Sequence, residues 1–140
     1  MVDERRFRAI LDRIGTEITE LRRLAAMDDA TLQADPERMP GVKYRLQIAV
    51  EACIDAAEHL IASEGLRAPE SFADTFTVLG EAGRLDATLA RSLEDAARFR
   101  NLLVHQYADV DDDRVREILR TRVVDFERFR TAVARLAADG

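Results

Sequence analysis

Apolar residues recur at three- and four-residue spacing along most of this chain, and that period constrains the fold more than any other feature. Only 3 Pro and 6 Gly occur among 140 residues, so few positions force a break in a helix. The first apolar stripe covers about five helical turns. Its members are Phe7, Ile10, Leu11, Ile14, Ile18, Leu21 and Leu24. The pattern favours an all-α fold over a sandwich or barrel.

The same period predicts one domain over residues 1–140, a helical bundle of four long helices and one short helix. Asp35-Pro36 and Met39-Pro40-Gly41 carry turn signals, so we expect a connection there with about one helical turn near Thr31 to Ala34. The expected helices run from Asp3 or Glu4 to near Met27, from about Val42 to Ser63, and from near Phe72 to Gly80 or Gly83. A fourth runs from Asp86 to near His105, and a last one follows the acidic turn at 109–113 and continues almost to the end.

Charge and cysteine content exclude some classes of protein. The net charge of −6 argues against a globally basic nucleic-acid-binding protein, although a local basic patch remains compatible with it. The single cysteine, Cys53, forms no internal disulfide and fits a reducing compartment. No apolar run approaches the ~18 residues of a membrane span, and no signal peptide is visible. We therefore expect a cytoplasmic protein without a membrane partner.

Residues 100–107 concentrate chemically active side chains in one stretch. It reads Arg100-Asn101-Leu102-Leu103-Val104-His105-Gln106-Tyr107. On a regular helix Asn101 and His105 share a face, whereas Arg100 and His105 lie roughly 140° apart. The long arginine side chain, a helix that loosens near His105, or a second copy of the protein could close this gap. Tyr107 is expected past the helix end, exposed or half-exposed.

These residue types suit phosphodiester cleavage without a metal. Arginine is a permanent cation whose planar donors match phosphate oxygens. Histidine can take the proton of a ribose 2′-hydroxyl or protonate the leaving oxygen, so the substrate would be RNA. On spacing alone, a purely structural interpretation is favoured over a catalytic one. His105 could interact favourably with the dipole at a helix C-terminus. Asn101 could be a buried amide whose hydrogen bonds are all made within the protein.

Four segments, in order and at similar spacing, resemble one protein family. They are Leu46-Gln47-Ile48-Ala49-Val50-Glu51-Ala52-Cys53-Ile54-Asp55, Pro69 with Asp74-Thr75-Phe76-Thr77-Val78-Leu79, Arg100-Asn101 followed by Val104-His105-Gln106-Tyr107, and Asp125-Phe126-Glu127. The chain is similar to the HepT-like toxins among the HEPN ribonucleases, whose Arg-(four residues)-His-x-Tyr motif matches residues 100–107. The resemblance covers about Tyr44 to Phe129.

The resemblance implies a homodimer with a composite cleft, in which the two motifs face each other. It implies a metal-independent endoribonuclease without a cofactor, with Arg100 and His105 as the catalytic pair and Asn101 as the polar residue beside them. It also implies a partner, a minimal nucleotidyltransferase antitoxin of the MNT type. That partner would transfer AMP from ATP to Tyr107, and the charged adduct would block the cleft and repel RNA.

Several other residues are candidates for weaker roles. Glu51 and Asp55 on the second long helix, and Arg98 seven residues before His105, are expected to support the site. Asp55 and His59 can pair on one helix face, most simply as a surface or interface pair. The acidic turn with Asp109, Asp111, Asp112 and Asp113 lacks the glycine and closing glutamate of a calcium loop, and is expected to cap a helix.

Two other functions remain open from the sequence. A helical dimer could use the motif only to dock its nucleotidyltransferase partner, without cleaving RNA. Alternatively, the chain could be an accessory subunit that presents ligands to that partner.

Overall fold

The fold consists of α-helices, with no strand in the part of the chain that the computed structural model describes, residues 3–139. Met1, Val2 and Gly140 of the expected domain lie outside the described residues. The elements are α1 (Glu4–Ala25), α2 (Asp29–Ala34), α3 (Arg38–Glu64), α4 (Phe72–Glu81), α5 (Ala87–His105), the 3-10 turn η1 (Tyr107–Asp109), α6 (Asp112–Thr121) and α7 (Val123–Asp139). The all-α helical bundle predicted from the sequence is therefore confirmed.

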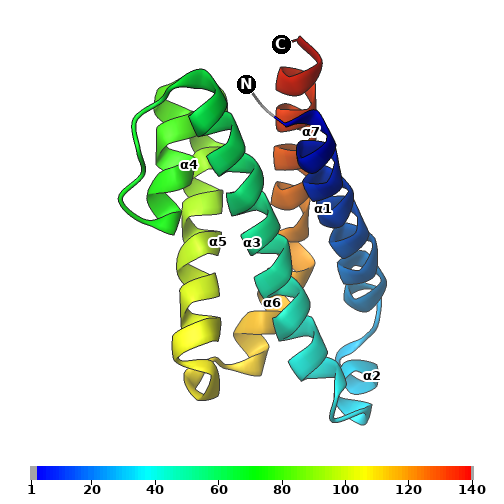
Figure 1. The fold of residues 1–140 in the computed structure, drawn as a ribbon. Coiled ribbons are helices and arrows are strands. Elements are labelled where there is room, and N and C mark those ends of the chain that lie inside the picture. Colours follow the sequence, from blue (N-terminus) through cyan, green and yellow to red (C-terminus); the bar gives the residue numbers. More distant parts are fainter. Residues whose placement is uncertain (1–2, 140) are drawn as a thin grey trace.

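The longest helix, α3, lies at the centre of the bundle. Figure 1 shows α4 and α5 on one side of it and α1 and α7 on the other. A helix with neighbours on two sides needs apolar residues around most of its circumference. The buried apolar residues of α3 are Met39, Val42, Leu46, Ala49, Val50, Ala52, Cys53, Ile54, Ala56, Ala57, Leu60 and Ile61. The core therefore continues through α3 and fixes α5, which carries residues 100–105.

Side-chain caps set the start of most helices. Asp3, Asp28, Ser71, Asp86 and Asp111 each accept a hydrogen bond from a backbone N–H in the following first turn. Asp86 was predicted in this role, and so was the acidic turn that contains Asp111. Helix α3 ends at Gly65, whose φ of 63° is left-handed and suits glycine. These ends fix the lengths of the helices around the site.

The last predicted helix is divided into α6 and α7 at Arg122. Three β-branched residues, Thr121, Val123 and Val124, surround that position and lower its helix propensity. Thr121 also donates from its hydroxyl to the carbonyl of Glu117 at 2.7 Å, a contact that bends helices. The apolar spacing continues across the break, which is why the sequence predicted a single helix.

The start of α3 also differs from the expectation. The predicted turn at Met39-Pro40-Gly41 lies inside the first turns of α3, which begins at Arg38. Proline is tolerated there, because N–H groups in a first turn have no acceptor within the helix. The structure thus has four long helices, as predicted, but three short ones among residues 3–139 instead of one.

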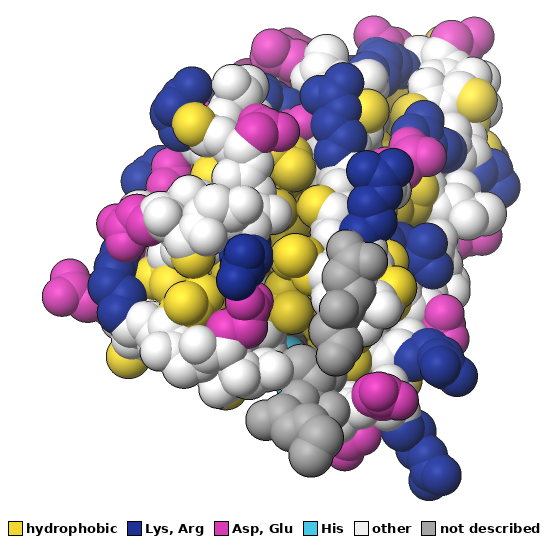
Figure 2. Space-filling model, turned by 90° about the horizontal axis from the view of Figure 1, so that it is seen from above, with side chains coloured by type: hydrophobic (Ala, Val, Ile, Leu, Met, Phe, Trp, Pro, Cys, Tyr) yellow, Lys and Arg dark blue, Asp and Glu magenta, His cyan; other side chains and the backbone are white. Residues whose placement is uncertain are grey.

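The surface of the bundle mixes both signs of charge. In the end-on view of Figure 2, acidic and basic side chains alternate around the periphery, while hydrophobic side chains surface between the helix ends. No helix among residues 3–139 is long and apolar enough to cross a membrane. Because the net charge is −6, any basic patch that binds a polyanion must be local.

Candidate active site

A cavity of about 480 Å³ opens between α3, the start of α4 and the C-terminal end of α5. Three of its lining residues are the polar members of the predicted motif, Arg100, Asn101 and His105. The remaining lining residues come from α3, from α4 and from the loop before α4: Glu58, Pro69, Glu70, Ser71, Phe72 and Thr75. The volume is in the range of small-ligand sites.

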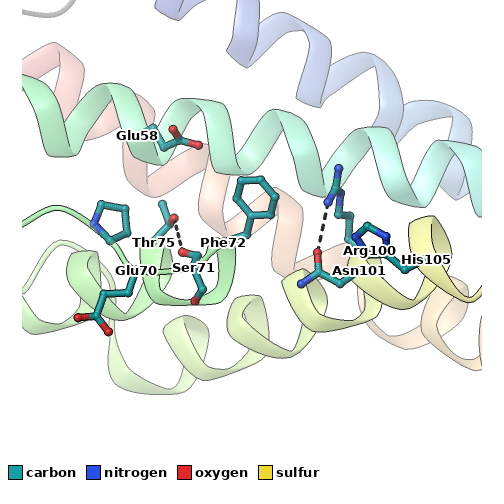
Figure 3. A pocket seen from close by; sticks show the side chains of 9 residues that line it. Glu58, Glu70, Ser71, Phe72, Thr75, Arg100, Asn101 and His105 are labelled. Carbon is teal, nitrogen blue, oxygen red and sulfur yellow. Dashed lines mark hydrogen bonds between the residues drawn. The ribbon is translucent and has the colours of Figure 1, made fainter.

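The geometry of α5 resolves the angular problem that the sequence posed. Arg100 and Asn101 lie on α5 about one turn before its end, and His105 is the last residue of the helix. Figure 3 shows the Arg100 side chain extending from α5 towards α3, with Asn101 beside it and the imidazole of His105 nearby. The reach of arginine therefore brings all three side chains to one cavity without a loosened helix.

Glu51 of α3 holds the Arg100 guanidinium. Arg100 Nε donates to Glu51 Oε2 at 2.8 Å, and Nη2 lies 2.6 Å from the same oxygen. Gln47 donates to that carboxylate from one turn earlier, at 3.2 Å. Arg100 Nη1 donates to Asn101 Oδ1 at 3.2 Å, which leaves the NH₂ group of Asn101 as a donor. A guanidinium has five N–H groups, so donors remain for an anion in the cavity.

Phe72 forms the opposite wall against Arg100. The Arg100 Cζ atom lies 5.0 Å from the centroid of the Phe72 ring, a cation–π distance. Phe72 is the first residue of α4, directly after its cap Ser71, and its side chain is 44% exposed. An exposed aromatic ring at the edge of a polar cavity can also stack against a nucleobase.

The loop before α4 is anchored by charge. Arg67 donates to Asp74 at 2.8 Å and to Glu81 at 3.0 Å, and the N–H of Glu70 donates to Asp74 at 2.9 Å. The Arg67 guanidinium and that N–H lower the pKa of Asp74 to about 2. These contacts fix Ser71, and with it the position of Phe72, at the mouth of the cavity.

Glu58 brings a carboxyl group into the far part of the cavity, well separated from Arg100 in Figure 3. Burial raises the pKa of Glu58, and the nearby charge of Asp55 raises it further. This acidic end of the cavity opposes a polyanion, whereas the end at Arg100 attracts one.

Tyr107 lies outside the cavity. It begins η1, two residues after His105, and its side chain is 46% exposed, as the sequence predicted. Lys43 of α3 places its Nζ 4.6 Å from the centroid of the Tyr107 ring. The same Nζ lies 3.0 Å from Asp112 Oδ1, at the start of α6.

The structure separates the residues expected to support the site. Glu51 contacts Arg100 directly. Asp55 is exposed on α3 and does not line the cavity, although its charge acts on Glu58. Arg98 is turned away: it pairs with Asp95 at 3.1 Å and lines a different groove, between α5 and α6. Arg98, which was expected to support the site, therefore does not line the cavity of Arg100 and His105 within this chain.

The contacts of His59 and of the acidic turn are those of packing, helix capping and ion pairing. The His59 ring packs edge-on against Phe7 of α1, with ring centroids 6.5 Å apart. In the acidic turn, Asp111 caps α6 and Asp112 pairs with Lys43. Within residues 3–139, no group of three or more His, Cys, Asp or Glu side chains converges as a metal site.

Reasoning from the sequence missed Phe72, Lys43 and Glu58 as neighbours of the motif. Phe72 was expected only as the start of a short helix, and its place directly after a capping serine puts it at the exposed end of that helix. Lys43 is the only lysine of the sequence, a signal that the sequence analysis did not use. Nothing in the local sequence marks Glu58.

The chemical capacity of the cavity follows from these contacts. An oriented guanidinium and an amide NH₂ group can bind an anion, and an exposed imidazole nearby can transfer a proton. The ring of Phe72 offers a surface for stacking. This combination suits the cleavage or binding of a phosphodiester.

Comparison with known proteins identifies the family. A family model described as ribonuclease HepT-like matches residues 14–133. The mRNA nuclease HepT of Shewanella oneidensis is 30% identical over 122 residues, 86% of this chain and 92% of that protein. The tRNA nuclease HepT of Aphanizomenon flos-aquae is 26% identical over 107 residues, 75% of this chain and 71% of that protein.

A solved structure has the same fold over nearly the whole chain. It is the tri-AMPylated Shewanella oneidensis HEPN toxin in complex with MNT antitoxin, with a TM-score of 0.85 and 27% identity. The match covers 96% of this chain and 98% of that chain. With most of its length matched by the family model, the chain belongs to the HepT-like ribonuclease family.

Proposed function

We propose that this protein is the RNA-cleaving toxin of a toxin–antitoxin pair whose antitoxin is an MNT-type nucleotidyltransferase. The observation that carries the proposal is the convergence of Arg100, Asn101 and His105 on one open cavity in a HepT-like chain. Relatives named as mRNA and tRNA nucleases support RNA as the substrate class. The complex of an AMPylated HEPN toxin with MNT antitoxin supports the partner.

In the proposed reaction, His105 takes the proton from a ribose 2′-hydroxyl. The 2′-oxygen attacks the adjacent phosphorus, the bond to the 5′-oxygen breaks, and a cyclic 2′,3′-phosphate forms. Arg100 and the NH₂ group of Asn101 stabilise the negative charge that grows on the phosphoryl oxygens. Because the proton transfer and the charge stabilisation are assigned to side chains, we expect cleavage to persist in EDTA.

A homodimer completes this site. One copy supplies a single imidazole to the cavity, whereas the reaction needs a base for the 2′-hydroxyl and an acid for the leaving oxygen. A second copy facing the first would supply the other His105. Tyr44, which is 63% exposed, and Val104, which is 39% exposed, provide apolar surface on α3 and α5 for such a contact.

Arg100→Ala and His105→Ala test the nuclease proposal. The wild type should slow growth and cleave RNA, and each variant should lose both properties by a factor of about 100 or more. RNA with a single 2′-deoxy sugar at the cut site should resist. Arg98→Ala is the matched control, an arginine on the same helix outside the cavity, and it should keep full activity. Wild-type toxicity of His105→Ala would remove the catalytic assignment.

We infer that transfer of AMP to Tyr107 inactivates the nuclease. We also infer that the protein acts on RNA in the cytoplasm. The intact mass of protein made with the nucleotidyltransferase should exceed that of protein made alone by whole AMP units, and Tyr107→Phe should abolish the difference. A pure protein that cuts no RNA, yet forms a stable complex weakened by Tyr107→Phe, would instead indicate a binding module.

A further inference from the structure

Lys43 is a buried cation that the proposed cleavage reaction does not use. Its side chain is only about one-tenth exposed, and lysine is rarely buried without a partner. The partner is Asp112, with Nζ and Oδ1 3.0 Å apart. The aliphatic stem of Lys43 lies near the start of α3, one residue after the fully buried Val42. The ammonium group is therefore held in one place.

Lys43 connects three segments that are distant in the sequence. It belongs to α3, its counterion Asp112 is the first residue of α6, and the ring above which it lies, Tyr107, begins η1. A carboxylate in the first turn of a helix is favoured by the helix dipole, which helps to fix Asp112. A cation over the face of a tyrosine ring attracts it electrostatically. Asp112 thus fixes Lys43, and Lys43 fixes the ring of Tyr107.

We propose that Lys43 is a positioning residue for AMP transfer to Tyr107, an inference that rests on the proposed function. By contacting one face of the ring, it keeps Tyr107 in a single orientation at the start of the exposed turn η1. Tyr107 is still 46% exposed, so an ATP-loaded enzyme can approach it. The phenol of Tyr107 is then oriented before the nucleotidyltransferase binds, so no conformational entropy is lost in ordering it during the reaction.

The charge of Lys43 also suits the chemistry of the transfer. The phenolic oxygen of Tyr107 attacks the α-phosphorus of ATP held by the nucleotidyltransferase. A new oxygen–phosphorus bond forms, the bond to the β-phosphate oxygen breaks, pyrophosphate leaves and the phenolic proton passes to water. The product is an aryl phosphodiester with one negative charge. The Lys43 ammonium lies beside the ring that receives this charge, while its pairing with Asp112 already offsets part of its own charge.

The ring orientation can be measured without any partner. The chain has two tyrosines and no tryptophan, so Tyr107 is the only strong fluorophore in a Tyr44→Phe background. In that background, Lys43→Met should lower the fluorescence anisotropy of Tyr107 and increase its quenching by acrylamide. Lys43→Arg should restore both. Arg45→Met, which removes another ion-paired cation of α3, should change neither.

The second measurement is the rate of AMP incorporation by intact mass, with ATP and the nucleotidyltransferase. Lys43→Met should be modified about tenfold more slowly than the wild type, while Lys43→Arg recovers most of the rate. RNA cleavage by unmodified Lys43→Met should match the wild type. If Lys43→Met does not fold, Lys43→Gln replaces it in both measurements.

The outcomes distinguish this inference from the function on which it rests. If wild-type protein accepts no AMP, the proposed modification fails, whatever Lys43 does to the ring. If the wild type accepts AMP and Lys43→Met is modified equally fast, the positioning role is wrong. Slower modification with an unchanged ring mobility would also overturn it, because the effect would then be electrostatic alone.

Discussion

Arg100 contacts one carboxylate oxygen of Glu51, Oε2, through two nitrogens, with Nε at 2.8 Å and Nη2 at 2.6 Å. Both side chains are largely shielded from solvent, which makes the pair stronger than a surface ion pair. The contact fixes the plane of the guanidinium and leaves Nη1 directed towards Asn101. Arg100 is therefore oriented before any substrate binds. The carboxylate of Glu51 offsets part of its positive charge.

Glu51→Gln should reduce RNA cleavage without abolishing it. The amide can still accept one hydrogen bond, but the ion pair that orients Arg100 is lost, and we expect kcat/KM to fall about tenfold. Cleavage of a fluorescent RNA under single-turnover conditions measures this. Glu17→Gln, which breaks the 3.1 Å pair with Arg45 elsewhere on α3, is the matched control and should leave cleavage unchanged. Full activity of Glu51→Gln would remove Glu51 from the site.

Phe72→Ala should weaken RNA binding more than it slows the chemical step. The ring lies 5.0 Å from Arg100 Cζ, and an exposed cation–π contact is worth about 0.5–1 kcal/mol. Its loss corresponds to roughly a two- to fivefold higher KM, and the loss of base stacking would add to this. Phe72→Tyr keeps the ring and should behave as the wild type. A change in kcat alone would contradict this role.

The sequence anticipated the motif residues but not the neighbours that orient them. Arg100, Asn101 and His105 lie at the end of one predicted helix, although their spacing alone left Arg100 and His105 on different faces of it. Glu51 was named as a supporting residue from its place on the second long helix, without a specific contact. Phe72 and Lys43 reach the motif only through tertiary packing of α4 and α3. Local spacing carries no information about such packing, which is why their roles appeared only in the structure.

The fold was predictable where periodicity and caps agree. Helix α5 begins after Asp86 as expected, because a capping aspartate precedes the apolar pattern. The break at Arg122 was missed, because the apolar period continues through it and no glycine or proline marks it. The start of α3 was placed four residues late, because Pro40 was interpreted as a turn and not as a first-turn residue.

Phe76→Ala should strongly destabilise the protein. Phe76 is fully buried on α4 and packs edge-on against Phe129 of α7, with ring centroids 5.7 Å apart. Removing a buried phenylalanine side chain costs about 3–5 kcal/mol of the free energy of unfolding. Urea denaturation measures the loss. Phe72→Ala on the same helix is the control: its side chain is 44% exposed, and its cost should stay below about 1 kcal/mol. Equal effects would contradict this assignment of the core.

The Arg67–Asp74 pair should make stability depend on pH in a defined window. Contacts with Arg67 and Glu70 lower the pKa of Asp74 from 3.8 to about 2 in the folded protein. The unfolded state therefore binds a proton more readily, so the contribution of Asp74 is fully present above the ordinary pKa. That contribution is lost as the pH falls through about 2.

Asp74→Asn isolates this contribution. The variant should unfold at a lower temperature than the wild type at pH 5, because the ion pair that anchors the loop before α4 is gone. The difference between the two proteins should shrink as the pH falls from 4 towards 2, since the wild-type carboxylate then becomes neutral too. Thermal melts across this range measure it. Asp95→Asn, which removes an exposed pair with Arg98, should show almost no difference at any pH. A gap that is constant with pH would mean that Asp74 acts through packing and not through its charge.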